Sequence, residues 1–242
     1  MISVFAPNTV SAPKLIAHRG YAVSLPQNSI CSFKEAARRK YWAIETDIRK
    51  TKDGVLVCSH DDTLLKHFGV DDVISNCDFA YLRTLRRIDG AGCPQDELVL
   101  PTFEEYLTIC KEADCLPFIE TKTPDVPEVL ETAFRFFGED EIVLSSCSFD
   151  HVLTAREVSK NVFIHHIFSD TDKCRILSEK GNAGLSYNYP NLDDVPDGLI
   201  DFTHSLGIRL CLRAGDTREK ALRMLEMGLD YIPTNCIDKL ED

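Results

Sequence analysis

Short apolar runs alternate with longer amphipathic stretches along the chain. Most of these runs lack a clean two-residue alternation of apolar and polar positions, which is typical of parallel strands that helices cover. We predict eight strands, at residues 14–18, 43–48, 116–120, 142–146, 162–168, 184–189, 208–212 and 230–233.

The stretches between the runs repeat apolar residues at helical spacing, most clearly over residues 125–137. We expect Asp125 to cap this helix, with Glu128 completing a capping box, and Thr102 with Glu105 to start another helix in the same way. Further helices are predicted at residues 150–159, 194–206 and 217–227. Eight strands, most of them followed by a helix, in 242 residues predict an α/β fold of the (β/α)8 TIM-barrel type.

One long interval breaks the alternation of strands and helices. Residues 61–100 are polar and irregular and contain Gly69, Gly90, Gly92 and Pro94. Because this interval lacks the pattern of a separate globular unit, we expect one domain over residues 1–242. Residues 61–100 then form a small insertion between the second strand and the helix that follows it.

Composition narrows the possible partners and location. The formal net charge is -12, and a negative field repels phosphate chains, so we expect neither nucleic-acid nor anionic-membrane binding. No apolar run approaches the roughly 20 residues that span a bilayer, so we expect no stable membrane insertion. The ten cysteines include no Cys-x-x-Cys pair, which disfavours zinc and favours reduced thiols over a disulfide framework. Together with the absence of a signal-peptide pattern, this predicts a cytoplasmic protein.

Polar residues at the ends of the predicted strands are the candidates for chemistry, because barrel active sites lie at the carboxyl ends of the strands. These candidates are His18, Arg19 and Gly20 after the first strand, Glu45 and Asp47 in the second, His60 beyond it, and Glu120 and Lys122 at the third. We expect all of them on one rim of the barrel.

The acidic candidates predict a metal site. Glu45 and Asp47 are two residues apart, so a strand places both side chains on one face. Two carboxylates directed into a barrel mouth repel each other unless a positive group lies between them, and a divalent cation with oxygen ligands meets that need. Glu120 is a third ligand from the neighbouring strand. The alternative is a pair of exposed acids, or an ion pair with Arg49.

The remaining candidates suit an acid-base reaction on a phosphate ester. His18 and His60 can exchange protons near neutral pH. Arg19 offers a planar fork that matches phosphate oxygens, and Lys122 offers a second positive charge.

An ordered series of motifs resembles the glycerophosphodiester phosphodiesterase family. Each motif alone is common, but the set is specific and covers roughly residues 15–235. The motifs are His18-Arg19-Gly20, Pro26-Gln27-Asn28-Ser29, Glu45-Thr46-Asp47, Thr51-Lys52-Asp53-Gly54, His60-Asp61-Asp62-Thr63-Leu64, Leu100-Pro101-Thr102-Phe103-Glu104-Glu105, Ile119-Glu120-Thr121-Lys122 and Ser148-Phe149-Asp150.

The resemblance implies a (β/α)8 barrel with a short insertion after the second strand, which hydrolyses glycerophosphodiesters to glycerol phosphate and an alcohol. It implies Ca²⁺ or Mg²⁺ as cofactor, with Glu45, Asp47 and Glu120 as metal ligands. It further implies His18 and His60 as the catalytic pair, and Arg19 and Lys122 as phosphate contacts. The partner is then a small glycerophosphodiester, and the oligomeric state stays open.

Three departures from the family pattern bear on the substrate. Gln27 stands where a glutamate is usual, which removes a negative charge near the site. The seventh strand ends at Leu212 and Arg213 in place of a Trp-Thr pattern, so the pocket wall changes and Arg213 is expected to add positive charge beside the substrate. Asn235 replaces the usual aspartate after the last strand.

Several alternatives stay open at this stage. The attacking group is either water or a glycerol hydroxyl of the substrate, which would give a cyclic intermediate. A related barrel phospholipase acting on lysophospholipids or phosphoinositides would expose an apolar rim, for which Phe68, Val70 and Phe79 are candidates. A barrel that binds a phosphodiester without turning it over is a third possibility.

Two further pairs lie in predicted strands. We expect one of His165 and His166 to face the barrel interior and the other to face the helices. Tyr187 and Tyr189 are expected to line the pocket.

Overall fold

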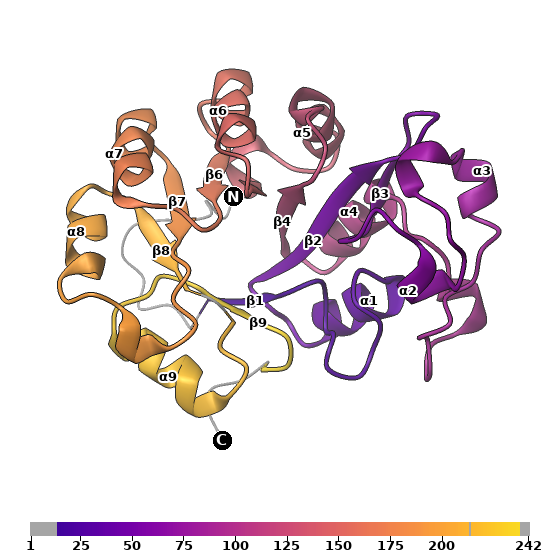
Figure 1. The fold of residues 1–242 in the computed structure, drawn as a ribbon, viewed down its shortest axis with the longest axis horizontal. Coiled ribbons are helices and arrows are strands. Elements are labelled where there is room, and N and C mark those ends of the chain that lie inside the picture. The colour runs from indigo at the N-terminus through magenta and orange to yellow at the C-terminus, as the bar shows by residue number, and fades with distance from the viewer. Residues whose placement is uncertain (1–13, 213, 238–242) are drawn as a thin grey trace.

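The described residues of the chain, 14–212 and 214–237 of a computed structural model, form a nearly closed barrel of parallel strands (Figure 1). Within this part of the chain the strands follow one another in the order β8-β7-β6-β5-β4-β2-β1-β9. Their bounds are β1 (Leu15–Ala17), β2 (Ala43–Lys50), β4 (Leu116–Thr121), β5 (Val143–Ser146), β6 (Phe163–His166), β7 (Ala183–Ser186), β8 (Arg209–Cys211) and β9 (Ile232–Thr234). Each predicted run overlaps one of these strands, so the predicted barrel is confirmed.

The ends of the strand series, β8 and β9, approach each other and almost close the ring. The backbone N–H of Asp230 donates to the carbonyl of Leu210 over 3.0 Å, and the carboxylate of Asp230 accepts from the N–H of Leu210 over 2.8 Å. Asp230 therefore joins the two edges where no ladder pairs them.

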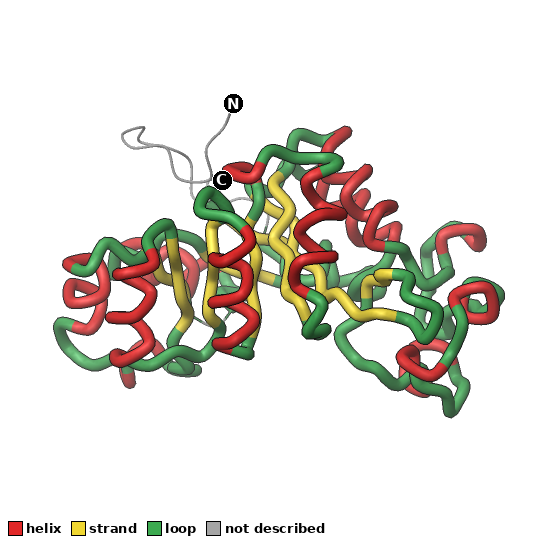
Figure 2. Tube along the Cα trace, turned by 90° about the horizontal axis from the view of Figure 1, so that it is seen from above, coloured by secondary structure: helices red, strands yellow, loops and turns green. Residues whose placement is uncertain are grey.

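Helices lie outside the ring of strands, as Figures 1 and 2 show from two directions. Their bounds are α1 (Ile30–Arg38), α4 (Phe103–Glu112), α5 (Val126–Phe134), α6 (Phe149–Val158), α7 (Thr171–Lys180), α8 (Leu199–Ser205) and α9 (Arg218–Glu226), with the short turns η3 (Glu139–Glu141) and η4 (Leu192–Asp194) between them. None of the helices in the described part of the chain has the length and hydropathy needed to cross a bilayer.

The helix starts were predicted with mixed success. Thr102 and Glu105 form the expected capping box of α4, each side chain accepting from the other's backbone N–H. The expected cap of α5 is wrong, because the side chain of Asp125 accepts from Lys50 at the end of β2 over 3.1 Å and makes no cap bond. The pattern did not indicate α7, of which only Cys174 and Leu177 are buried.

Two apolar layers hold the barrel together. The larger lies between the strands and the helices. The smaller fills the barrel interior with Ile16, Phe118, Phe163, Tyr231 and their neighbours, and Trp42 stacks on Tyr231 with 6.3 Å between ring centroids. These side chains close the barrel from within, which leaves its carboxyl-end rim for polar groups.

The insertion after β2 has its own small core. The strand β3 (Leu56–Cys58) pairs antiparallel with the end of β2, and α2 (Leu65–Phe68), η1 (Ile74–Asn76), α3 (Phe79–Leu82) and η2 (Gln95–Glu97) follow. Phe68 is buried in its apolar cluster, and Val70 and Phe79 are partly buried against it. These three residues pack within the insertion and so do not form the apolar rim that a lipid substrate would need.

The expectation of reduced thiols is wrong for one pair of cysteines. Cys31, the second residue of α1, forms a disulfide with Cys93 of the insertion, and the other eight cysteines are free. The bond joins two positions 62 residues apart in sequence, which the spacing of the cysteines did not reveal. Because of this disulfide, the cysteines no longer support a cytoplasmic location.

Candidate active site

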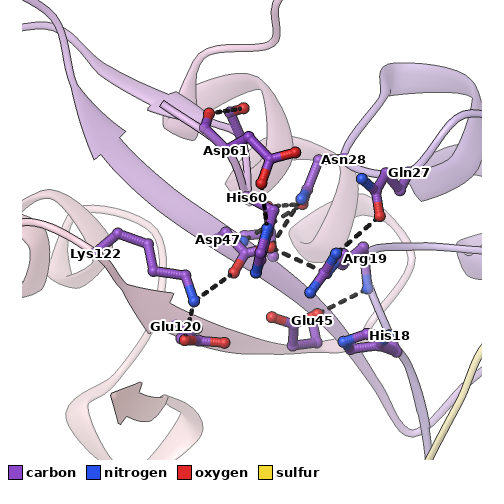
Figure 3. A network of polar contacts seen from close by, with 12 residues as sticks. His18, Arg19, Gln27, Asn28, Glu45, Asp47, His60, Asp61, Glu120 and Lys122 are labelled. Carbon is purple, nitrogen blue, oxygen red and sulfur yellow. Dashed lines mark hydrogen bonds and ion pairs between the residues drawn. The ribbon is translucent and has the colours of Figure 1, made fainter. Parts of the chain in front are cut away.

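Three buried carboxylates meet at the carboxyl ends of β2 and β4. Glu45 and Asp47 alternate along β2, and the register of the two strands sets Asp47 directly beside Glu120. One oxygen from each of the three lies within 4.8 Å of the others, and none of the three residues is more than 7% exposed. The strand register thus brings the predicted ligand set together (Figure 3).

Two cations partly compensate these carboxylates. The ammonium of Lys122 contacts Glu120 and lies 3.2 Å from Oδ1 of Asp47, and Nε of Arg19 lies 3.3 Å from its other oxygen. Burial alone would raise the pKa of Asp47, but Lys122 and Arg19 outweigh it and hold the pKa below its usual value. Burial, together with the charges of Asp47 and Glu120, instead raises the pKa of Glu45 well above its usual value.

The cluster therefore has more negative charge than its own cations can balance. Oε1 of Glu45 is buried and has no hydrogen-bond partner in the described residues, and burial with the Asp47 charge also raises the pKa of Glu120. Three carboxylates with an orphaned oxygen and a deficit of positive charge fit a hard divalent cation with oxygen ligands. Arg49 is not their partner, since it donates to the backbone carbonyl of His60 over 2.7 Å.

His60 lies just beyond β3, beside this cluster. Its Nδ1 is 2.8 Å from the carboxylate of Asp61. That contact fixes the ring, because an ionised Asp61 can only accept and Nδ1 must carry the proton. The hydrogen bond with His60 lowers the pKa of Asp61. The Nε2 atom of His60 is left as the one that can give or take a proton.

His18 follows β1 and is held by a residue that follows the neighbouring strand, β9. Its Nδ1 lies 2.9 Å from Oδ1 of Asn235, which follows β9. The side-chain amide of Asn235 donates in turn to Asp216 over 2.8 Å, which turns the Asn235 oxygen toward the ring. Burial, together with the Arg19 charge, lowers the pKa of His18. The neutral ring therefore carries its proton on Nδ1 and presents Nε2.

Arg19 and Gly20 need an unusual backbone. Arg19 has a φ of 58°, and its N–H donates to Glu45 over 2.7 Å. Gly20 has a φ of +80°, and a Cβ there would lie 2.5 Å from Oγ of Ser32 in α1. Glycine is required because the loop crosses α1 at this distance with left-handed torsions.

These side chains line one cavity of about 550 Å³ at the barrel mouth. His18, Arg19, Glu45, His60, Glu120 and Lys122 all contribute to its wall. Phe168, Leu212, Asp216 and Lys220 line it as well. Arg213, the further predicted phosphate contact, lies outside the described residues.

The expectations for the two other strand pairs have different outcomes. His165 faces the cavity, with Nδ1 2.6 Å from the Tyr231 hydroxyl, whereas His166 contacts the ring of Phe149 in α6, as predicted. The prediction for Tyr187 is wrong, because its hydroxyl lies 3.1 Å from that of Thr203 in α8, on the helix side of the barrel. Tyr189 packs beside it and is absent from the cavity wall.

Comparison with known proteins places this site in a family. The sequence profile of the glycerophosphoryl diester phosphodiesterase family matches residues 18–239, which is most of the chain. This chain belongs to the glycerophosphoryl diester phosphodiesterase family. A glycerophosphodiester phosphodiesterase of Caldanaerobacter subterraneus is 29% identical over 234 residues, covering 91% of this chain and 93% of that protein.

Solved structures of the family share the fold. A phosphodiesterase of Oleispira antarctica in complex with the product sn-glycerol-3-phosphate superposes with a TM-score of 0.84 over 95% of both chains, at 20% identity. A glycerophosphodiester phosphodiesterase of Parabacteroides distasonis has a TM-score of 0.77 over 92% of both chains, at 25% identity. The barrel of this phosphodiesterase family member is therefore the family's barrel.

Sequence reasoning missed the residues that orient the phosphodiesterase site from its loops. Asn28 donates to Asp47 over 2.9 Å, and Asp61 contacts His60. Asp216 holds Asn235, and His67 of α2 contacts Gln27. Asn28 and Asp61 stand inside the motifs quoted above, so position in a motif was the available signal. Asp216 and His67 carry no local signal, because their partners are far away in sequence.

Proposed function

We propose that this chain hydrolyses glycerophosphodiesters to glycerol 3-phosphate and an alcohol. The observation that carries the proposal is the wall of a single cavity, which holds two histidines, two cations and two carboxylates of the buried triad. Family membership supports the same reaction class. A phosphodiester carries a negative charge, so it needs the positive groups that this cavity offers.

The proposed cofactor is Ca²⁺ or Mg²⁺, held by Glu45, Asp47 and Glu120. A divalent cation there would neutralise and polarise a phosphoryl oxygen. Its charge would also let all three carboxylates ionise together, which the two cations of the chain do not achieve alone.

The side chains have separate proposed roles. Arg19 and Lys122 bind the phosphoryl oxygens and stabilise the charge that builds up on them. One of His18 and His60 takes a proton from the attacking hydroxyl through Nε2, and the other gives a proton to the departing alcohol. The bond from phosphorus to the alcohol oxygen breaks as the bond from phosphorus to the attacking oxygen forms. The attacking hydroxyl belongs to water or to the glycerol group.

We also propose that residues 1–242 act as one catalytic domain with a small-molecule partner. The insertion over residues 61–100 supports this proposal, because it contacts the barrel through the disulfide and through the polar chain from His67 to Gln27. Its role would be to complete the site and not to form a separate unit.

The first test is turnover of glycerophosphocholine and glycerophosphoethanolamine with Mg²⁺ or Ca²⁺, beside a long-chain lysophosphatidylcholine. We expect activity on the short substrates and its loss in a chelator. His18→Ala and His60→Ala should each lower kcat by about 10²–10⁴-fold, the range for removal of a general acid or base. Phosphorus NMR of the reaction would reveal a cyclic glycerol phosphate if the glycerol hydroxyl attacks.

The matched control is His204→Ala, which removes a histidine paired with Asp230 over 2.9 Å outside the cavity wall. Its activity should equal that of the parent. Parental rates in both His18→Ala and His60→Ala would refute the catalytic pair. Preference for the lysolipid would favour a phospholipase, and product-free binding of the diester would favour a non-catalytic barrel.

A further inference from the structure

A chain of polar contacts runs from the insertion to Arg19. Nη1 of Arg19 donates to Oε1 of Gln27 over 2.9 Å, and Nε2 of Gln27 lies 3.1 Å from Nε2 of His67 (Figure 3 shows the first contact). Nδ1 of His67 lies 2.7 Å from Asp89. Two hydrogen bonds from Arg87, of 2.9 and 3.0 Å, hold Asp89 at the far end.

The chemistry of the end groups fixes the direction of every bond in this chain. A guanidinium only donates, so the carbonyl oxygen of Gln27 must face Arg19 and its amide NH2 must face His67. Nε2 of His67 must then accept, and its proton must be on Nδ1, where the Asp89 carboxylate accepts it. Only an uncharged His67 in one tautomer satisfies all of these groups.

The surroundings of His67 favour that uncharged form. The residue is 8% exposed, and burial lowers its pKa despite the hydrogen bond with Asp89, with Arg87 and Lys66 acting in the same direction as burial. Asp61 faces the same ring nitrogen as Gln27, 4.0 Å from Nε2. A second proton on His67 would therefore find Asp61 as an acceptor but would lose Gln27.

At its other end, this series of polar contacts reaches Arg19 on the phosphate-binding side of the cavity. Asp47 contacts Arg19 at Nε, so Gln27 supplies the contact that fixes the guanidinium at one of its terminal nitrogens. Without this contact the guanidinium can rotate about the Cδ–Nε bond, and the donors that face the cavity lose their alignment. A second cavity, of about 380 Å³, is lined by Gln27, His67 and Asp89, so protons from solvent can reach the chain.

We propose that His67 is a positioning residue that aligns Arg19 through Gln27, and that it does so only while uncharged. When His67 takes a second proton, its Nε2–H turns the Gln27 oxygen toward itself and the Gln27 NH2 toward the guanidinium, which releases Arg19. The assignment rests on the proposed function, in which Arg19 binds the phosphate. The insertion thereby makes phosphate affinity sensitive to acid.

The test compares His67→Phe with the parent in steady-state turnover of glycerophosphocholine and in calorimetric binding of glycerol 3-phosphate. We expect KM and the product Kd to rise about tenfold, because one hydrogen bond to a charged group is lost, with kcat changed less than about threefold. In the parent KM should rise at acid pH, and in His67→Phe this rise should be smaller, because only the competition of protons with the cation for the carboxylates remains. His204→Phe, at a His–Asp pair outside the cavity, is the matched control.

Rescue separates positioning from a merely structural role. Gln27→Glu in the His67→Phe background places a carboxylate against Arg19, which holds the guanidinium without help from His67. We expect KM to return to within about threefold of the parent value, since a charge-assisted bond replaces the lost contact. Failure of the rescue, or parental KM in His67→Phe at every pH, would overturn the proposal.

A measurement without turnover tests the relay, meaning the effect of His67 on Arg19 through Gln27, separately from the reaction. Long-range proton–nitrogen NMR of the parent should show His67 neutral and protonated at Nδ1, and its further protonation should coincide with a loss of affinity for inorganic phosphate. A charged His67 at neutral pH would refute the relay. If the parent turns over no diester but this coincidence holds, the proposed function fails and the relay stands.

Discussion

The hydrogen-bond partner of His18 is the uncharged amide of Asn235 and not a carboxylate. The chain Asp216–Asn235–His18 keeps the carboxylate one residue away from the imidazole. An amide oxygen orients the ring and selects the tautomer, but it stabilises an imidazolium less than an adjacent carboxylate does. Burial, together with Arg19, therefore lowers the pKa of His18, although the Asn235 hydrogen bond and the charges of Asp47 and Asp216 act in the opposite direction.

Exchanging these two residues tests that reasoning. The double variant Asp216→Asn with Asn235→Asp keeps the number of hydrogen bonds and moves the carboxylate against Nδ1 of His18. The pKa of His18 should rise, and the limb of the kcat/KM profile that reports His18 should move to higher pH by about 1. The limb that stays in place is the internal control. The limb that moves shows whether His18 is the base or the acid.

The single variant Asp216→Asn completes this experiment. It removes a charge that raises the pKa of His18, so the same limb should stay in place or move to lower pH. An unmoved profile in the double variant would show that His18 does not govern either limb.

At the same scale, sequence predicted the residues that belong to strands and missed those that join loops. Glu45, Asp47 and Glu120 follow from strand period and register, which are local properties. The contact of His18 with Asn235 spans 217 residues, and that of Gln27 with His67 spans 40. Such pairs depend on where the closed barrel places its loops, and no spacing along the chain encodes that.

Among the elements, the barrel strands were the most predictable and the insertion the least. The strands are buried apolar runs of a length that the sequence shows directly, whereas α7 buries only Cys174 and Leu177 and lacks a strong apolar stripe. The Asp125 cap failed because Lys50 competes for the carboxylate from another element. Cysteine spacing cannot give the pairing of Cys31 with Cys93, since many pairings of ten cysteines are possible.

The disulfide joins α1 to the insertion, and its removal should be measurable. The bond closes a loop of 62 residues, so in the chain-entropy account it stabilises the fold by about 4 kcal/mol. Cys93→Ser should lower the free energy of unfolding in urea by about that amount, and dithiothreitol should do the same to the parent. Thiol titration of the denatured parent should find eight free thiols before reduction.

Cys77→Ser is the control for this prediction. Cys77 is a free, partly exposed cysteine of the same insertion. Its variant should keep most of the parent's stability and still respond to dithiothreitol. Equal stability of the parent and Cys93→Ser in oxidising buffer would contradict a stabilising disulfide.

For the molecule as a whole, net charge and site charge point in different directions. The net charge of -12 disfavours polyanions. At the barrel mouth Arg19 and Lys122 meet three carboxylates, so the site itself is short of positive charge. A divalent cation would make the net charge of the site positive. A small, negatively charged phosphodiester could then bind there, although the protein as a whole is acidic.

This charge deficit couples global stability to pH and to the cation. The folded pKa values of Glu45 and Glu120 are raised, so their contribution to stability is present below their ordinary value of 4.5 and is lost as pH rises through the folded values. The pKa of Asp47 is lowered, so its contribution is lost as pH falls. In a chelator, the two glutamates should therefore make stability fall as pH rises above about 4.5.

Adding Mg²⁺ or Ca²⁺ should offset this loss. A ligand at about 100 times its Kd that binds only the folded state stabilises it by about 2.7 kcal/mol, or about 5–10 °C in Tm for a chain of this size. The gain should be larger at neutral pH than near pH 5, because protons compete for the carboxylates.

Glu45→Gln should raise Tm in the chelator, by removing a buried charge, and should abolish most of the gain. Glu104→Gln, at an exposed glutamate of α4, should behave like the parent. An equal gain in Glu45→Gln and the parent would mean that the cation binds elsewhere, and the acidic cluster would then need another explanation for its buried, unpartnered oxygen.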